Sequence, residues 1–374
     1  MALIKEPYGL VYNDDGSLCT TYRDDDVPFA GVRSFAVETA TTNFMPSEKT
    51  FVEGTYSNSY PFFAQFFDFA TLGINNLEKV TFSLEFYNDS IALANGGSLL
   101  VTVYRSPGTS ATYVWATPSS PTWVRKEYTF QRDDSILDGS GNPYTGFSIY
   151  LYHYPNYTPG YTHIRKLQVE KKPFASSFVN GTRPKGRLVI SVEDLKFDIA
   201  NDDWVISYWK YPVATRDDTQ NGYNLCSLGR GITGDTKGYI WWGKENNMNK
   251  YRLLVVLSGA TYISNTSYNT FNPTDYFYHW HYEVLKKQGK VLSYYVDGVK
   301  QCELIIPADK EIQTPFDVGL NLGGYIFENS FFPTNALIAA PYYGYNSATW
   351  TDDYIREVYE AKIPFSVQSQ LSIY

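Results

Sequence analysis

The sequence predicts an all-β protein, because aromatic residues are abundant, short runs alternate apolar and polar side chains, and turn residues separate the runs. The chain has 34 Tyr, 23 Phe and 8 Trp, and aromatic side chains favour a pleated, half-buried sheet surface. Its 374 residues exceed what one hydrophobic core usually supports. We therefore expect two antiparallel β-sandwiches in tandem, with a short helix near the C-terminus.

Short alternating or apolar runs begin at Phe63 and continue through the first half of the chain. Six of them are the predicted strands of a first sandwich: residues 77–87, 98–104, 113–117, 123–130, 146–154 and 161–170. Clusters of Gly, Pro, Asn and Asp separate the runs, and these residues supply the backbone angles that tight turns require. This spacing is typical of an all-β domain.

A boundary is predicted over residues 173–187, where the alternation stops and Pro173, Gly181, Pro184 and Gly186 interrupt the chain. The expected layout has an N-terminal segment, a first sandwich, a linker, a second sandwich and a C-terminal tail. In that order their bounds are 1–44, 45–172, 173–187, 188–365 and 366–374.

The strand pattern restarts after the boundary. Eight runs are the predicted strands of the second sandwich: residues 188–192, 204–211, 239–242, 251–258, 277–286, 291–296, 301–306 and 317–322. Asp297 and Gly298 separate two of them and predict a two-residue type I′ hairpin turn, which needs positive φ at both positions. A helix is predicted over residues 349–361, where Thr351 or Asp352 can cap its N-terminus.

Charge and cysteine content exclude several classes of partner. A net charge of -8 argues against binding to a phosphate backbone, so we expect no nucleic-acid partner. Cys19, Cys226 and Cys302 are scattered without disulfide or metal spacing, which indicates folding in a reducing cytoplasm and no cofactor. The sequence shows no signal-peptide pattern and no run approaching 18 apolar residues, so we expect no membrane insertion.

Three segments of the second half resemble the laminin-G-like jelly roll of the concanavalin A lectin superfamily. Residues 204–210 resemble the early core strand of that family, and residues 278–284 with 294–300 resemble its central hairpin. The closing pattern, residues 338–346 and then 350–359, is similar to the last strand and terminal helix of the family. The resemblance implies a lectin-like jelly roll over residues 188–365.

The first half resembles the jelly-roll sandwiches of cellulose-binding-type carbohydrate-binding modules. Residues 164–170 resemble the final strand of that family, although Arg165 and Lys166 replace two acidic residues, so only the fold is implied. The order of the pieces from residue 31 to 365 resembles phage tail, fibre and minor structural proteins that carry a lectin-like domain. This implies a virion protein made in the host cytoplasm, a homo-oligomer whose partners are other virion proteins and a host-surface glycan.

Catalytic patterns are missing from the sequence. Enzymatic relatives of the lectin fold carry a Glu-x-Asp-x-x-Glu strand, and residues 193–198 come nearest but have the wrong spacing, which predicts a solvated loop. His279 and His281 flank Trp280 on a predicted strand and are expected on one sheet face rather than on a metal. We therefore expect neither an enzyme nor a metal site.

Exposed aromatic residues are the remaining candidates for binding, since a sugar ring stacks on Trp or Tyr. One cluster is a turn rich in Tyr, and the other is a Trp pair just before a polar loop. The candidate residues are Tyr154, Tyr157 and Tyr161 in the turn, and Trp241, Trp242, Asn246 and Asn247 near the pair. Subunit contacts are the alternative for both clusters. Trp204 and Trp209 are expected on opposite faces of one strand, with at most one in the core.

The sequence thus favours a non-enzymatic virion structural protein of the tail, fibre or capsid surface, which mediates glycan attachment or subunit contacts. A glycoside hydrolase or depolymerase with an unfamiliar carboxylate pair is one alternative. A bacterial surface adhesin is the other.

Overall fold

The computed structural model divides into two compact units, which are described separately. Unit 1 comprises Met1–Ala40 with Pro184–Tyr374, and unit 2 comprises Thr41–Arg183. The described residues are 2–3, 11–12, 22–23, 27–30, 32, 34–38, 40–55, 61–106, 109–115, 121–154, 159–176, 178–183, 186–195, 197–213, 224–231, 237–244, 250–267, 273–328, 330–345 and 347–362.

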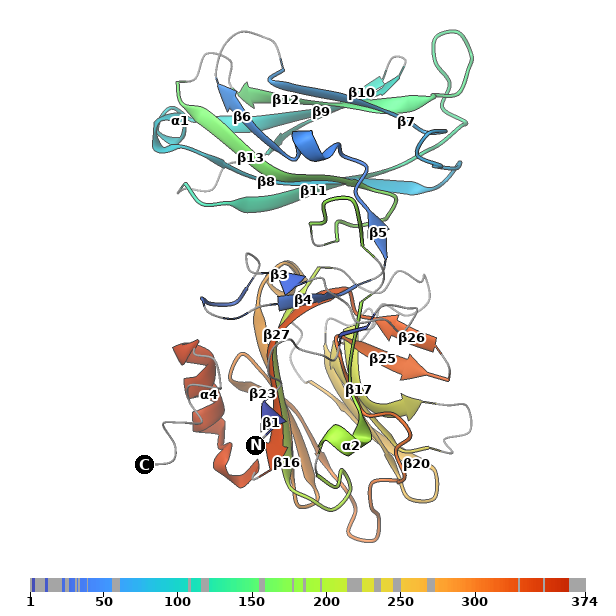
Figure 1. The fold of residues 1–374 in the computed structure, drawn as a ribbon, viewed down its shortest axis with the longest axis vertical. Helices are drawn as coiled ribbons and strands as arrows, with labels where there is room; N and C mark the ends of the chain where they lie inside the picture. Colours follow the sequence, from blue (N-terminus) through green and yellow to red (C-terminus); the bar gives the residue numbers. More distant parts are fainter. Residues whose placement is uncertain are drawn as a thin grey trace. The chain divides into compact units, whose positions relative to one another are not determined.

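Unit 2 is a sandwich of two four-stranded antiparallel sheets (Figure 1). The first sheet has the order β10-β9-β12-β7, with bounds Thr109–Trp115, Ser98–Ser106, Gly146–Tyr154 and Phe63–Asp68. The second has the order β11-β8-β13-β6, with bounds Val124–Gln131, Lys79–Asn88, Tyr161–Glu170 and Phe51–Thr55. The short elements are β5 Thr41–Thr42, η1 Ser47–Lys49, α1 Ser90–Ala94 and β14 Thr182–Arg183.

The core of unit 2 follows from strand alternation. Along β12 the residues Phe147, Ile149 and Leu151 are buried, while the side chains between them are only half-buried. They pack against Phe82 and Phe86 of β8 in the other sheet, within one hydrophobic cluster. Since successive side chains of a strand point to opposite faces, the intervening residues of β12 face away from this core.

The division between the units lies between Arg183 and Pro184, inside the segment expected as a linker. The residues before the division are held to unit 2 by hydrogen bonds. The Ser176 backbone N–H donates to Glu170 Oε2 at 2.9 Å, and the Val179 backbone N–H donates to Gln168 Oε1 at 2.8 Å. That part of the segment is therefore packed structure.

Unit 1 is a larger sandwich. Its first sheet has the order β23-β22-β21-β16-β27-β4-β3, with bounds Val299–Ile305, Val291–Val296, His281–Gln288, Trp204–Pro212, Ala336–Tyr345, Ser34–Val37 and Tyr22–Arg23, and β1 Ala2–Leu3 pairs with β27. The second has the order β2-β15-β24-β17-β18-β19-β20, with bounds Val11–Tyr12, Arg187–Ile190, Leu320–Leu322, Asn224–Gly231, Tyr239–Lys244, Tyr251–Leu257 and Thr261–Thr266.

The remaining elements of unit 1 lie on this framework. They are β25 Gly324–Phe327, β26 Ser330–Pro333, α2 Val192–Leu195, α3 Pro273–Tyr276, η2 Ser347–Thr349 and α4 Asp352–Ala361. All strand pairs described in unit 1 are antiparallel except β17 with β25, which is parallel. The predicted fold class, antiparallel β-sandwiches with a short helix near the C-terminus, is confirmed.

Of the residues expected as a separate N-terminal segment, 1–40 belong to unit 1 and 41–44 to unit 2. Strand β4 pairs with β27, with Val37 opposite Ala336 and Phe35 opposite Ile338. Val37 is fully buried in the core between the two sheets. Unit 2 is therefore inserted into unit 1, between β4 and β15, rather than preceding it.

Unit 1 has a second hydrophobic cluster outside the space between its two sheets. Trp204 is buried in the core between the sheets, as expected for one of the two tryptophans of β16. Trp209 is buried too, because Tyr359 of α4 stacks near its ring at 5.9 Å and Phe29 meets its edge at 5.6 Å. The two tryptophans therefore lie on opposite faces of β16, as expected, and α4 covers the outer face on which Trp209 lies (Figure 1).

Candidate functional site

The outward face of the β10-β9-β12-β7 sheet in unit 2 carries a row of tyrosines. Tyr150, Tyr152 and Tyr154 alternate with the buried residues of β12, so all three point away from the core. The backbone register places Tyr150 beside Thr102 of β9 and Ala64 of β7. The side chains directly beside the Tyr150 ring are therefore smaller than the ring.

Two neighbouring strands widen this row. Tyr104 of β9 meets the Tyr150 ring edge-on, with 5.1 Å between ring centroids. The rings of Tyr150 and Tyr152 are near-parallel, with centroids 6.4 Å apart. Phe66 of β7 lies opposite Ser148 in the register, as Tyr104 does from the other side. We call these five residues the tyrosine face: Phe66, Tyr104, Tyr150, Tyr152 and Tyr154.

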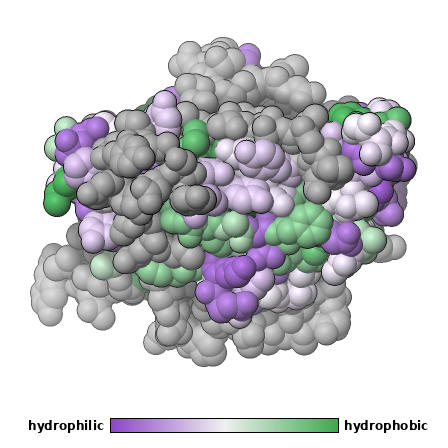
Figure 2. All heavy atoms as spheres, turned by 90° about the horizontal axis from the view of Figure 1, so that it is seen from above, coloured by the Kyte–Doolittle hydropathy of each residue, from purple (hydrophilic) through white to green (hydrophobic). Residues whose placement is uncertain are grey.

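The tyrosine face is accessible. Tyr104 is 40% exposed, Tyr154 42% and Phe66 46%, whereas Tyr150 and Tyr152 are half-buried. Figure 2 is taken from the side of Figure 1 on which this sheet is drawn, and pale and green residues gather in the middle of that view. Among the described residues, part of the ring surface on this face, chiefly that of Tyr104, Tyr154 and Phe66, is thus open to a ligand.

The phenol of Tyr152 on this face remains neutral. Burial raises the pKa of the Tyr152 phenol, and the neighbouring Tyr104 and Tyr150 raise it further. A neutral phenol both donates and accepts a hydrogen bond. The row therefore combines flat apolar rings with hydroxyl groups at their edges, an arrangement that suits a ligand with one apolar face and several hydroxyls.

A second aromatic cluster lies on the opposite sheet, and its rings are already engaged. Tyr87 of β8 stacks on His163 of β13 at 4.5 Å and meets Trp123 edge-on at 4.6 Å. The Arg165 guanidinium lies 4.1 Å from the centre of the Trp123 ring. Tyr161, a residue expected at the binding turn, is 46% exposed but belongs to this cluster rather than to the tyrosine face.

The two tryptophans expected as binding residues differ in position. Trp242 is fully buried between the sheets of unit 1, and its indole N–H donates to the Tyr208 hydroxyl at 2.9 Å. Its assignment as a surface contact is therefore wrong, because strand alternation turns it inward. Trp241 faces outward but packs against Tyr239 at 4.7 Å and Tyr325 at 5.1 Å, which leaves it only partly exposed.

Three other expected residues, Tyr157, Asn246 and Asn247, lie outside the described residues. Of the expected binding residues, Tyr154 alone falls on the tyrosine face. Sequence reasoning missed Tyr104, Tyr150 and Phe66. Alternation along residues 98–104 and 146–154 carries the signal for Tyr104 and Tyr150, but the pairing of β9 with β12, which brings them together, is not visible in the sequence.

The interior of unit 1 contains a charged pair, Lys210 and Glu283. Lys210 Nζ lies 3.4 Å from Glu283 Oε1, and both side chains are fully buried. The Tyr208 hydroxyl donates to Glu283 Oε2 at 2.5 Å, and burial together with Cys226 and Glu283 holds the Tyr208 pKa well above its usual value. Since Trp242 of the other sheet donates to the same hydroxyl, this network links the two sheets.

The candidate residues for catalysis and metal binding do not come together in the described part of the chain. His279 is exposed and precedes β21, so it does not share a strand face with the buried His281, contrary to expectation. Glu193 and Asp194 are exposed on the short helix α2, which replaces the expected loop. Among the described residues, no group of three or more His, Cys, Asp or Glu side chains is placed to hold a metal ion. No helix in the described part of the chain is long and apolar enough to cross a bilayer.

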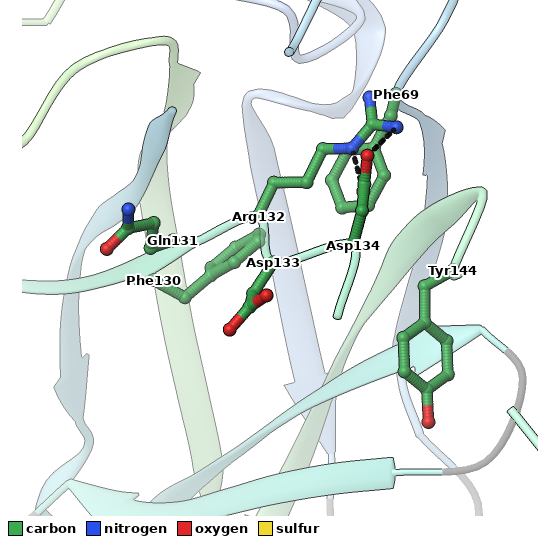
Figure 3. A pocket seen from close by; sticks show the side chains of 7 residues that line it. All are labelled: Phe69, Phe130, Gln131, Arg132, Asp133, Asp134 and Tyr144. Carbon is green, nitrogen blue, oxygen red and sulfur yellow. Dashed lines mark hydrogen bonds and ion pairs between the residues drawn. The ribbon is translucent and has the colours of Figure 1, made fainter. Parts of the chain in front are cut away.

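Figure 3 shows a cavity in unit 2 that is too small for a sugar. It is lined by Phe69, Phe130, Gln131, Arg132, Asp133, Asp134 and Tyr144. Its volume is about 10 Å³, which is room for a single water. Arg132 makes two bonds to Asp134, at 2.7 and 3.0 Å, and lies over the Phe69 ring. Arg132 and Asp134 thus pair with each other, and the space beside them has no room for a sugar.

No family model matches the sequence, and no curated protein matches it. Among solved structures, the chain is similar to the botulinum neurotoxin serotype D binding domain, with 14% identity over 50% of this chain and 42% of that chain and a TM-score of 0.31. It is also similar to domain 4 of an extracellular arabinanase from Geobacillus stearothermophilus in complex with arabinotriose, with 13% identity over 50% and 80% and a TM-score of 0.31. A third is the Ruminococcus gnavus IT-sialidase CBM40 bound to alpha2,3 sialyllactose, with 14% identity over 42% and 83% and a TM-score of 0.29. TM-scores of this size leave the function to be argued from the residues of this chain.

Proposed function

We propose that this protein is a non-enzymatic virion surface component that binds host glycans through the tyrosine face of unit 2. The observation that carries the glycan-binding part is the outward row of near-parallel and edge-on rings formed by Tyr104, Tyr150 and Tyr152, with the exposed Phe66 on the neighbouring strand. The virion setting rests on the order of sequence segments that resembles phage tail, fibre and minor structural proteins.

A glycan suits the chemistry of this face better than a purely apolar partner does. The C–H face of a sugar stacks on a ring, while its hydroxyls bond to the phenol groups and to polar side chains beside them. Ser148 lies on the same face as the rings, is half-buried and supplies such a group. A row that extends along β12 from Tyr150 to Tyr154 favours a chain of sugars over a single one.

Two observations on carboxylate side chains support the non-enzymatic part of the proposal. The sequence lacks the paired strand carboxylates of enzymatic relatives of the lectin fold, and Glu283 is engaged by Lys210 and Tyr208. Purified protein should therefore release no oligosaccharide from host polysaccharide in a reducing-sugar assay. Release that is abolished by changing one Asp or Glu would favour the depolymerase alternative.

Replacing a tyrosine of the tyrosine face tests whether this face is the binding site. Tyr150→Ala removes a ring whose burial against a sugar would contribute about 1.5 kcal/mol to the binding free energy. Glycan affinity should therefore fall roughly tenfold. The matched control is Tyr262→Ala, which removes a 60% exposed tyrosine from β20 of unit 1. Glycan-array binding, host adsorption and virion incorporation should be measured for both variants.

The three readouts separate the alternatives. Reduced glycan binding and adsorption with normal incorporation, for Tyr150→Ala alone, is the expected result. Reduced incorporation with unchanged glycan binding would assign the tyrosine face to a subunit contact. Normal behaviour in all three assays would overturn the proposal.

A further inference from the structure

The two sheets of unit 2 differ in their content of charged residues. Asp68 and Arg105 are the only Lys, Arg, Asp or Glu residues in the strands of the β10-β9-β12-β7 sheet. Each strand of the other sheet contains at least one such residue, and β8, β11 and β13 carry charges of both signs. The tyrosine face therefore lies on the sheet that offers fewer partners to a charged ligand.

The two charged residues of this sheet occupy different positions in the strand alternation. Arg105 lies opposite the buried Phe147 in the register, whereas the rings of the tyrosine face lie at the alternating positions. Asp68 follows the buried Phe67 on β7, so it shares the outward side of the sheet with Phe66. The charged residue at an outward position of these strands is thus a carboxylate.

The Asp68 carboxylate keeps its negative charge. Its Oδ1 atom accepts from the Thr71 backbone N–H at 2.7 Å. This bond and one from the Thr71 side chain lower the pKa of Asp68, and the charge of Arg132 contributes less. Arg132 is paired with Asp134 at 2.7 Å. A ligand carboxylate at this end of the tyrosine face would therefore meet a charge of the same sign.

Two basic groups come close to this sheet from its other side. His153 alternates with the tyrosines of β12 and is buried, and burial lowers its pKa, so the imidazole is neutral at pH 7. Its Nδ1 atom lies 2.7 Å from the Thr162 hydroxyl. Lys49 donates to Gln65 Oε1 at 2.5 Å, and Gln65 alternates with Phe66 along β7. Neither group places a cation among the described rings of the tyrosine face.

We infer that the tyrosine face selects uncharged glycans, an inference that rests on the function proposed above. Its rings and hydroxyls can stack on and hydrogen-bond to a neutral sugar without any charge. An acidic sugar would lose hydration on this face without gaining a cation among the described residues, and Asp68 would repel it. The substrate class is therefore a neutral chain of sugars that lies along β12.

The first test uses the full chain on an array of neutral and acidic hexasaccharides. The wild type should bind neutral members, and Tyr150→Ala should weaken that binding roughly tenfold. The neutral glycan bound most tightly is then compared by calorimetry with its C6-oxidised derivative, in which carboxylates replace the hydroxymethyl groups. The derivative should bind at least tenfold more weakly. Affinity for the neutral glycan should change less than about twofold between about 50 and about 500 mM salt, because salt screens only interactions between charges.

A charge added to the face tests the cause of this selectivity. Ser148 lies opposite Tyr104 on one side and Phe66 on the other, so Ser148→Lys places a cation between the rings. It should narrow the difference between the two probes at least threefold. The matched control is Ser140→Lys, which adds the same charge at an exposed loop position of unit 2 and should leave the difference unchanged.

The outcomes separate this inference from the proposed function. Acidic glycans that the wild type binds as tightly as neutral ones, and that Tyr150→Ala weakens, would overturn the selectivity and keep the tyrosine face as a glycan site. A strong loss of affinity with salt, or equal effects of Ser148→Lys and Ser140→Lys, would overturn it too. If Tyr150→Ala weakens no glycan on the array, the proposed function itself fails. If Ser148→Lys does not fold by circular dichroism, the oxidised probe and the salt series decide.

Discussion

The Nδ1 atom of His281 lies 2.6 Å from Oδ2 of Asp297, and its Nε2 atom lies 2.9 Å from the Tyr276 backbone carbonyl oxygen. A carboxylate and a carbonyl both accept, so both ring nitrogens donate and the imidazole carries a positive charge. Oδ1 of the same carboxylate accepts from the Tyr282 backbone N–H at 2.8 Å. The pair therefore fastens the β22–β23 turn to the start of β21.

This pair makes the stability of unit 1 depend on pH. Burial of His281 opposes the charged form, but the hydrogen bond and charge of Asp297 and the Tyr276 carbonyl outweigh burial and raise the His281 pKa above 6.5. A raised folded-state pKa gives stability that is full below the unfolded value and is lost as pH rises through the folded value. Denaturant unfolding should show the wild type losing more stability than His281→Gln between pH 6 and pH 9. Equal losses would contradict this assignment.

Trp242 should be a stability residue and not a binding residue. Trp242→Ala empties a fully buried site and removes the donor to the Tyr208 hydroxyl, so the free energy of unfolding should fall by about 3–5 kcal/mol. Tyr104→Ala on the tyrosine face is the matched surface change and should stay within about 0.5 kcal/mol. Chemical denaturation followed by tryptophan fluorescence compares the two, and a loss below 1 kcal/mol for Trp242→Ala would place its ring outside the core.

Helix α4 should be essential to unit 1, because it covers the outer sheet face on which Trp209, Tyr282 and Tyr342 lie. Ile355→Ala removes a fully buried α4 side chain and should cost about 2–5 kcal/mol. Glu357→Ala changes an exposed position of the same helix and should have little effect. Thermal unfolding distinguishes them, and similar midpoints for both variants would show that α4 contributes little.

Sequence patterns predicted the local features, a hairpin turn and a helix cap, because both depend on residues adjacent in the chain. Asp297 and Gly298 both have positive φ, 52° and 77°, and join Val296 to Val299 as a two-residue turn, as predicted. Thr351 caps α4 by accepting from the Tyr354 backbone N–H at 3.1 Å, one of the two caps considered.

Features set by distant parts of the chain could not be predicted in this way. Alternation shows that Trp204 and Trp209 face opposite ways, but not that a helix 140 residues later covers one of them. Strand β17 was missed because Gly229 and Gly231 interrupt its pattern, and the ring of Phe316 occupies the space beside Gly229. The tyrosine face was found only in part, since its rings come from three strands whose pairing is long-range.

The insertion of unit 2 into unit 1 predicts how fragments of the chain fold. Residues 41–183 contain the complete core of unit 2 and should fold alone. Residues 184–374 lack β4, whose Val37 is buried in the unit 1 core and lies against Gly323, so this fragment should not fold cooperatively.

Restoring the missing strand is the matched control. Thr41 pairs with Arg183, and the Gly186 backbone N–H donates to the Glu38 carbonyl at 3.0 Å, so the two chain ends left by removing unit 2 are adjacent. Residues 1–40 joined to residues 184–374 by a short Gly-Ser linker should therefore fold. Circular dichroism, amide NMR dispersion and denaturant unfolding compare the three fragments. Cooperative unfolding of residues 184–374 alone, at the same midpoint as the joined fragment, would show that β4 is dispensable.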